Sequence, residues 1–455
     1  LALLADDRGA NLATLGAILL FGMTVTELRH TPAPPTGTPG EYEIVVRERL
    51  SEREGKTASG TTIRARRNSA TGEWLPAAGN LVVRCDSSTA LNPGDRAVVR
   101  GKIYPFTARH GGYGRLMTRR GYVGTLYLNR SSLLLSDTLH RELSPKHLSL
   151  FLHERAVARL DRLALAPDEQ ALCNAMTAGD RRSLSPALRA AYSRSGTSHL
   201  LAVSGLHVGI VFLLANLLLW WLPLFRHGHI LRNIAVILLI WLYAATTGFP
   251  PSVVRAALMF SVLQFALASS SEYVGMNTLA GVAFVMLLFH PDYLFDISFQ
   301  LSFIAVAGII AWGLPLCRLL RTRRKSIDML TATLAIGFSA YAATAPLISH
   351  TFGQISVVGL ALNPVVILLS YVVVGSCTLW LVIPGTVLAP LFSVVAGFAA
   401  RAQNELIRAA AALPAAALDI RLTTTQCWIV YGLFIFATLL LWSAERKKSV
   451  SSLPE

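Results

Sequence analysis

Charged residues are scarce in this sequence of 455 residues, because Asp, Glu, Lys and Arg together make up only 15% of it. Acidic residues are the scarcer kind, with 26 against 41 basic ones and a formal net charge of +15. Apolar residues reach 53%, and the mean hydropathy is positive. This composition excludes a large soluble protein and favours a membrane protein.

Cysteine is also sparse, and the five cysteines lie far apart without a C-x-x-C spacing. Neither a disulfide framework nor a zinc knot is therefore expected. A P-loop of the G-x-x-x-x-G-K-[ST] type is absent, so any ATP-driven step must come from a partner. We predict no metal site, no cofactor and no catalytic residue.

The charges that are present separate a polar region from an apolar one. Residues 41–130 hold 16 basic and 8 acidic side chains, whereas residues 196–443 hold only 11 and 6. The chain starts with Leu, and its first residues, "LALLADDR", read as the end of a helix, so we expect the natural chain to begin earlier. Residues 11–28 lack a small-x-small cleavage site and are predicted to be a retained membrane helix.

The pattern predicts a polytopic α-helical membrane protein with a small extracytoplasmic all-β, OB-like domain. The Pro/Gly segment "RHTPAPPTGTPG" cannot continue a helix and marks a boundary. Five short β-type runs follow: "YEIVVRERL", "TTIRARR", "NLVVRC", "DRAVVRGKIY" and "YVGTLYL". The predicted parts are a membrane segment and linker at 1–40, the OB-like domain at 41–130, amphipathic interfacial helices at 131–195, a transmembrane domain at 196–443 and a cytoplasmic basic tail at 444–455.

Apolar runs dominate the chain from residue 199 onward. They lie at about 199–222, 233–247, 256–270, 278–290, 297–316, 327–350, 357–384, 391–413 and 426–443. Several fall short of the roughly 20 residues that a full span needs, and 391–413 also carries charges. The basic segments 226–232, 318–325 and 445–448 are predicted to be cytoplasmic by the positive-inside rule, which places the β domain outside.

Several motifs resemble one known family. The run "AGDRRSLSPALRAAYSRSGTSHLLAVSGLHVGI" resembles the membrane domain of the ComEC family of bacterial DNA-uptake proteins. The segments "TGFPPSVVRAALM", "HPDYLFDISFQLSFIAVAGII" and "FGQISVVGLALNP" are similar to further blocks of that domain, in the family's order. The resemblance implies a channel that moves single-stranded DNA across the bacterial cytoplasmic membrane during natural transformation.

One part of the family's pattern is missing from this sequence. Many members carry a metallo-β-lactamase-like nuclease domain, which needs a His-x-His-x-Asp-His cluster, but the nearest string here is "HGH" at 227–229. We therefore predict no nuclease activity for this chain. The partners that the resemblance implies are single-stranded DNA, membrane lipid, a DNA receptor protein, a separate nuclease and a cytoplasmic ATPase motor.

Ser204 and His207 lie three residues apart in an apolar segment, on one predicted helix face. They are open to three interpretations. A catalytic dyad needs the hydroxyl within reach of the imidazole, and two groups on one helix turn face each other poorly. The pair could instead be satisfied by backbone groups. The interpretation that we favour is a polar cavity, with Gly205 and Gly209 permitting close helix contact.

Arg255 is a sharper signal, because the prolines of "GFPPSVVRAALM" begin a helix and place it within about two turns of the start. A helix N-terminus concentrates positive potential, so an added arginine makes a phosphate site. The alternative is an arginine that reaches up to the lipid headgroups. The predicted DNA path also includes Ser252, Gln300 and Asn363, with Asn363-Pro364 expected to break a helix.

The β region combines basic and aromatic residues, of which we predict a DNA-binding set of Arg64, Arg66, Arg67, Trp74, Lys102 and Tyr104. Charge follows the backbone of single-stranded nucleic acid, and rings stack on its bases. A solvated basic surface with the rings in the barrel core is the alternative. The function predicted from the sequence is thus a DNA channel and not an enzyme; an intramembrane serine hydrolase and a small-molecule transporter are the alternatives.

Overall fold

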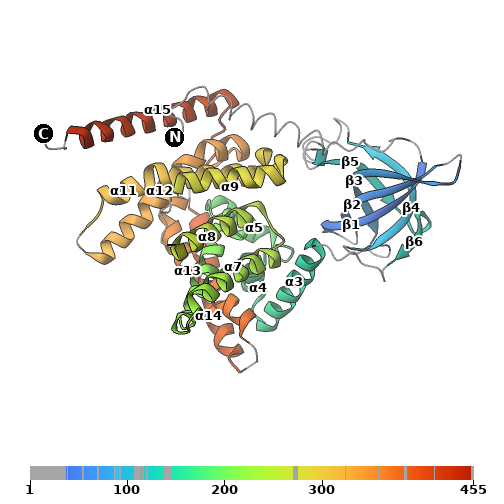
Figure 1. The fold of residues 1–455 in the computed structure, drawn as a ribbon, viewed down its shortest axis with the longest axis horizontal. Helices are drawn as coiled ribbons and strands as arrows, with labels where there is room; N and C mark the ends of the chain where they lie inside the picture. Colours follow the sequence, from blue (N-terminus) through green and yellow to red (C-terminus); the bar gives the residue numbers. More distant parts are fainter. Residues whose placement is uncertain are drawn as a thin grey trace. The chain divides into compact units, whose positions relative to one another are not determined.

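The computed structural model describes residues 37, 39–53, 56–68, 71–86, 89, 91, 94–106, 114, 117–118, 121–137, 145–269, 275–322, 324–356, 358–383, 387–413 and 416–451 (Figure 1). The predicted membrane segment at 11–28 lies outside these residues. The chain divides into two compact units, residues 1–151 with 285–295 and residues 152–284 with 296–455. The β domain belongs to the first unit and most of the helices to the second.

The β domain is a closed barrel, because its first strand pairs with a strand on each of its two edges. The strands are β1 (Pro39–Arg53), β2 (Lys56–Arg67), β3 (Trp74–Asp86), β4 (Arg96–Pro105), β5 (Tyr122–Leu128) and β6 (Leu133–Asp137). Their order is β1-β2-β3-β5-β4-β6, and an additional β1–β4 pairing closes the barrel. Alternate residues face the core, where Ile44, Leu81 and Leu126 are fully buried. The five predicted strands and the OB-like domain are confirmed.

The sheet extends past the predicted limit of residue 130, which is a correction. Strand β6 pairs with β4, from Val99↔Leu133 to Arg96↔Asp137. Its apolar run is too short to be separated from a helix by periodicity alone. Pairing with β4 decides its conformation.

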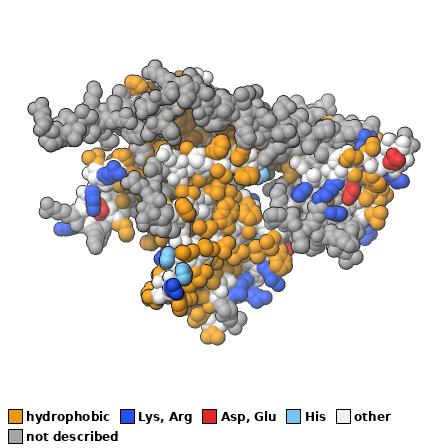
Figure 2. Space-filling model, in the orientation of Figure 1, with side chains coloured by type: hydrophobic (Ala, Val, Ile, Leu, Met, Phe, Trp, Pro, Cys, Tyr) orange, Lys and Arg blue, Asp and Glu red, His pale blue; other side chains and the backbone are white. Residues whose placement is uncertain are grey.

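Most of the rest of the described chain is helical, apart from loops and the two short paired strands β7 (Ile355–Ser356) and β8 (Ala417–Leu418). The helices are α3 (Pro145–Leu160), α4 (Pro167–Thr177), α5 (Pro186–Arg194), α6 (Gly205–Leu218), α7 (Gly228–Thr246), α8 (Pro251–Ser269), α9 (Gly275–Phe289), α10 (Ile297–Gly308), α11 (Leu314–Leu319), α12 (Lys325–Phe352), α13 (Val358–Val382), α14 (Ala389–Ala411) and α15 (Thr424–Ser451). Hydrophobic side chains cover much of the face of the helical part that is in view (Figure 2).

Among the described residues, five helical segments are long and apolar enough to cross a membrane. They are Gly205–Leu224, Gly228–Thr246, Ile297–Leu319, Ile327–Phe352 and Val358–Val382. Shorter apolar helices cover Pro251–Ala266, Gly275–Phe289 and Thr424–Thr438. The predicted polytopic helical membrane protein is therefore confirmed, and α14 is not among these candidates.

Helix α4 does not fit the predicted interfacial segment at 131–195. Residues 171–177 are all buried, and α4 packs against α13 and α14 in the main helical core. Its acidic residues, Asp168 and Glu169, lie in the first turn, where carboxylates favour the helix dipole. Burial against α13 and α14, which lie far away in the chain, thus makes α4 part of the helical core instead of a surface helix.

Helix α15 continues to Ser451, so residues 445–448 of the predicted basic tail are helical. The cytoplasmic location of this tail stays a prediction.

Candidate anion site at the start of two helices

Ser204 and His207 form the N-terminal cap of α6. Ser204 is the N-cap residue, and its backbone N–H donates to Nδ1 of His207 at 3.0 Å. The arrangement is that of a capping box with histidine in the place of the usual Glu or Gln. The two residues therefore do not share a helix face as predicted, because α6 begins only at Gly205.

The His207 ring is fully buried. Because Nδ1 accepts a hydrogen bond, the neutral ring carries its proton on Nε2. That Nε2 has no hydrogen-bond partner in the described part of the chain. The imidazole thus holds the helix start and leaves one polar atom free in the core.

Helix α8 begins beside the start of α6. Pro251 is its first residue, as predicted, and Arg255 follows one turn later. The Ser252 hydroxyl donates to the Val203 carbonyl at 2.9 Å, which ties the first turn of α8 to the segment just before α6. Two helix N-termini, each with free N–H groups and positive potential, therefore lie together.

Arg255 is buried at this junction, with only 6% of its surface exposed. A Cβ atom placed on Gly205 would lie 3.1 Å from its Nη2, so the guanidinium reaches the first turn of α6. Its Nε has no hydrogen-bond partner among the described residues. Its one described partner is the Phe303 ring of α10, whose centroid lies 5.8 Å from the guanidinium carbon.

An arginine without a carboxylate is costly to bury, because charges in a protein interior are normally paired. Here the charge is added to two positive helix ends. This arrangement of fixed donors suits an anion such as phosphate.

Close helix packing brings these groups together. A Cβ on Gly209 would meet the Phe260 ring at 3.4 Å, and one on Gly205 would meet Ala256 at 3.6 Å besides Arg255. Helices α6 and α8 are thus in contact, but an added Cβ would meet Phe260 and Ala256 at ordinary van der Waals distances, so the predicted role of the two glycines in close helix contact stays a prediction.

The interior of the α6–α8 bundle is filled with side chains. Val208, Val211, Val236, Ile240 and Ala257 belong to one buried apolar cluster. Five predicted path residues, Ser204, Gly205, His207, Ser252 and Arg255, therefore lie at one end of a packed bundle. A path through the middle of these three helices is not present in the described structure.

The other two predicted path residues lie on different helices. Gln300 is on α10, one turn before Phe303, and its helix is capped by Asp296, whose carboxylate accepts from the Ser298 N–H at 2.7 Å. Asn363 is on α13, and its Oδ1 is buried without a partner in the described residues. Pro364 lies inside a continuous α13, so the predicted helix break is wrong.

The α4–α5 loop lies beside the segment just before α6. A Cβ on Gly179 would lie 3.3 Å from Val203, and His153 Nδ1 lies 3.1 Å from the Thr246 carbonyl oxygen. Asp180 is neutralised by Arg182, whose hydrogen bonds hold the pKa of this carboxyl low although burial acts to raise it.

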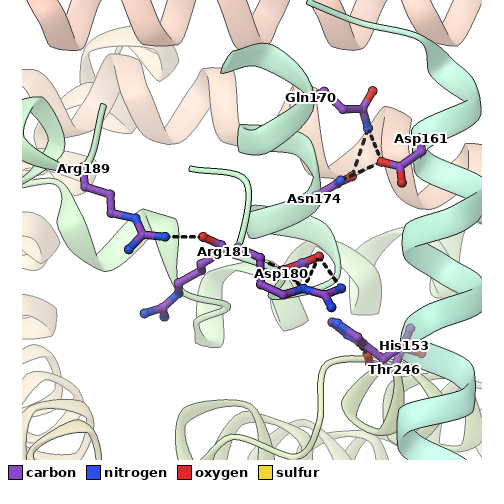
Figure 3. Close-up of polar contacts among 9 residues, drawn as sticks. His153, Asp161, Gln170, Asn174, Asp180, Arg181, Arg189 and Thr246 are labelled. Atoms are coloured by element: carbon purple, nitrogen blue, oxygen red, sulfur yellow. Dashed lines mark hydrogen bonds and ion pairs between the residues drawn. The ribbon is translucent and has the colours of Figure 1, made fainter. Parts of the chain in front are cut away.

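Two further arginines in this region add positive charge (Figure 3). Arg189 donates to the backbone carbonyl of Arg181. Burial, and then the nearby charge of Arg189, lower the pKa of Arg181. Arg181 and Arg189 therefore add positive charge to the segment that follows α4.

The predicted DNA-binding residues of the β domain fall into two groups. Arg64, Arg66, Arg67 and Trp74 lie on β2 and at the start of β3, where Arg67 pairs with Trp74 across the ladder. Arg67 and Arg100 both bind Glu41, with Arg67 Nη1 at 3.1 Å from Oε2. The charge of Arg67 is thus partly neutralised by Glu41 of the same barrel.

The second group is on β4 and β5. Tyr104 is 47% exposed, and Lys102 Nζ lies 5.7 Å from its ring centroid. Tyr127, which the sequence analysis missed, is 54% exposed and packs edge-on against Tyr104, with ring centroids 5.8 Å apart. Two exposed rings beside a lysine form a surface on which bases could stack. Only strand pairing, not sequence spacing, brings Tyr127 there.

The fold and the site together define an integral membrane protein that has a separate β barrel and, in its helical part, a buried cation with no ion-pair partner among the described residues. The chain belongs to the competence protein family, whose model matches residues 176–447.

Two relatives are similar to part of this chain. ComE operon protein 3 of Bacillus subtilis (strain 168) is 32% identical over 204 residues, which are 44% of this chain and 24% of that protein. An uncharacterized protein of Aquifex aeolicus (strain VF5) is 29% identical over 201 residues, 44% of this chain and 45% of its own. The matches thus span less than half of either relative. No solved structure matches the chain.

Proposed function

We propose that this protein moves single-stranded DNA across the bacterial cytoplasmic membrane during natural transformation. Membership of the competence protein family supports a role in DNA uptake. The observation that carries the proposal is Arg255, which is buried at two helix N-termini without a carboxylate among the described residues. A transport protein for a polyanion needs such fixed positive groups along its path.

The proposed topology places this site on the outer side of the membrane. With segments 226–232, 318–325 and 445–448 in the cytoplasm, α6 runs inward and α7 returns outward. The starts of α6 and α8 then face the compartment that holds the β domain. A cysteine introduced at Thr71 is expected to react with a membrane-impermeant reagent on intact cells, and one at Thr322 only after permeabilisation.

The β domain is proposed to bind the incoming strand through the Tyr104, Tyr127 and Lys102 surface. Phosphate neutralisation would dominate this binding, so its affinity should fall steeply with salt. A DNA receptor protein, a separate nuclease and a cytoplasmic ATPase motor are the proposed partners.

We propose no enzymatic role for Ser204. His207 Nδ1 accepts the backbone N–H of Ser204, so this ring nitrogen is not available as a base for the hydroxyl. The geometry therefore favours a cap over the serine hydrolase. No specific observation favours a small-molecule transporter.

The test of this function is DNA internalisation in a strain from which the gene has been deleted. Labelled DNA that becomes resistant to external nuclease should depend on the restored protein, and uptake of labelled small solutes should not. Normal DNA internalisation in the deletion strain would refute the proposal, as would a loss of solute uptake with DNA uptake intact.

A further inference from the structure

Helices α6 and α7 are joined by a tight turn whose shape depends on one glycine. A short helical turn, Leu222–Leu224, follows α6, and the Gly228 N–H donates to the Phe225 carbonyl at 2.9 Å. A Cβ atom placed on Gly228 would lie 1.6 Å from the Leu222 carbonyl oxygen, so only glycine fits this close backbone contact. The connection is therefore a tightly packed turn.

This α6–α7 turn lies at a membrane surface. Only residues 225–227 separate the candidate spans Gly205–Leu224 and Gly228–Thr246. Two spanning helices that are joined so closely reverse direction where they leave the hydrocarbon, and this holds for either side of the membrane. The side chains around the turn therefore meet lipid headgroups.

Large apolar side chains are exposed around the turn. Trp220, Leu224 and Phe225 are 65%, 78% and 63% exposed, and Trp221 is 44% exposed. The Trp221 and Phe225 rings pack edge-on with centroids 6.0 Å apart, so they hold each other in place. Tryptophan is typical of the membrane–water boundary, because its ring is apolar and its N–H is polar. The turn thus offers apolar surface to acyl chains.

Arg232 lies in the first turns of α7, where α6 fixes its position. Its Nη2 donates to Asn216 Oδ1 at 2.8 Å, and the Asn216 amide donates in turn to the Phe212 carbonyl at 3.0 Å. The Nε of Arg232 is buried and has no hydrogen-bond partner among the described residues. A guanidinium has five N–H donors, so Asn216 orients the group and leaves donors for an anion.

The charge of this part of the chain has one sign. Residues 181–271 hold seven arginines and no Asp or Glu. Arg226 in the turn is exposed, and the exposed His229 shares a helix face with Arg232, three residues further on. The ammonium group of a zwitterionic lipid finds no carboxylate in this stretch, whereas a phosphate finds cations. The charge therefore favours an anionic headgroup.

We propose that the α6–α7 turn binds one anionic phospholipid, with the lipid phosphate on Arg232 and the acyl chains against the exposed rings. Trp220 follows Asn216 by four residues, so its ring lies on the side of the turn where Asn216 holds the guanidinium. An arginine beside an anionic headgroup raises the affinity about fivefold. The site takes a lipid and not DNA, because apolar rings surround the cation. It depends neither on the proposed transport nor on the orientation of the chain.

Native mass spectrometry of the purified full chain tests this lipid site. The protein in detergent receives equal amounts of phosphatidylglycerol and phosphatidylcholine that carry the same acyl chains. The parent chain should retain one phosphatidylglycerol, with a preference of about fivefold or more over phosphatidylcholine. Arg232→Gln should remove most of this preference. Arg321→Gln is the matched control, because it removes the same charge from another exposed basic segment, and it should leave the preference unchanged.

Equal retention of the two lipids by the parent chain would overturn the proposal. Equal losses in Arg232→Gln and Arg321→Gln would also overturn it, because net charge and not a site would then govern binding. Release of the bound lipid by excess inorganic phosphate or by a short oligonucleotide would assign Arg232 to free phosphate or to DNA instead.

Two further variants keep the test decisive if Arg232→Gln unfolds. Arg232→Lys keeps the charge and should retain part of the preference, since only the planar fork is lost. Trp220→Ala keeps every charge and should weaken retention of phosphatidylglycerol, because apolar contact with the acyl chains is lost; unchanged retention in this variant would contradict the proposed lipid contact. The thermal midpoint of each variant without added lipid shows whether it is folded.

Discussion

Replacing Arg255 by methionine should stabilise the protein while it impairs transport. The guanidinium is 6% exposed, and the Phe303 ring is its one described partner. A buried ion costs several kcal/mol, and a cation–π contact returns about 0.5–2 kcal/mol of that. Methionine fills a similar length without charge, so we expect the free energy of unfolding to rise by about 1–4 kcal/mol.

Thermal unfolding of purified protein in detergent measures this change. Inorganic phosphate or a short oligonucleotide should raise the midpoint of the parent protein, because a ligand that binds the folded state stabilises it, and should not raise that of Arg255→Met. Arg255→Lys should retain part of the effect, since charge is kept and the planar fork is lost. A loss of about 3–5 kcal/mol in Arg255→Met, as for a broken buried ion pair, would refute the open anion site.

Three other substitutions follow from the structure. Ser204→Ala should keep most DNA uptake and lower the free energy of unfolding by about 1 kcal/mol, because a helix cap is lost. Ser204→Leu should abolish uptake. Complete loss of uptake in Ser204→Ala at normal abundance would instead support a nucleophilic role for Ser204. Gly196→Ala should lower the thermal midpoint, because φ at this residue is +74° and the new Cβ would lie 2.4 Å from the Cβ of Ser356. The left-handed backbone alone costs about 1–2 kcal/mol for a residue with a Cβ. Gly337→Ala is the control and should leave the midpoint unchanged, because nothing lies within 4 Å of the added Cβ. Hydrogen bonds from Arg100 and Arg67 hold the pKa of Glu41 below its ordinary value of 4.5. The ionised Glu41 therefore stabilises the barrel at pH values above 4.5, and this stabilisation is lost as the pH falls through the lowered pKa. Glu41→Gln should make the free energy of unfolding depend less on pH in the acid range, and an unchanged dependence would count against the ion pairs.

Local signals in the sequence predicted the elements well. Prolines marked the start of α8, and turn residues separated the five barrel strands. These features depend on residues close together in the chain. The predicted break at Pro364 failed because a helix can hold a proline when its neighbours satisfy the freed backbone group.

Contacts between residues far apart in the chain could not be predicted from the sequence. Nothing in the spacing shows that Arg255 reaches Gly205, or that Tyr127 packs on Tyr104. The burial of α4 depends on its packing against α13 and α14, two hundred residues away. The sequence therefore identified Arg255 as a candidate, and the packing of α6 against α8 shows where its guanidinium lies.

DNA entry into sealed vesicles tests the central claim most directly. The purified protein is placed in liposomes that contain a single-strand nuclease, and labelled single-stranded or duplex DNA is added outside. We expect single-stranded DNA to be degraded only in vesicles with the protein, duplex DNA to survive, and Arg255→Ala to slow the degradation. Degradation no faster than in empty vesicles, with the protein shown to be folded and inserted, would contradict the account.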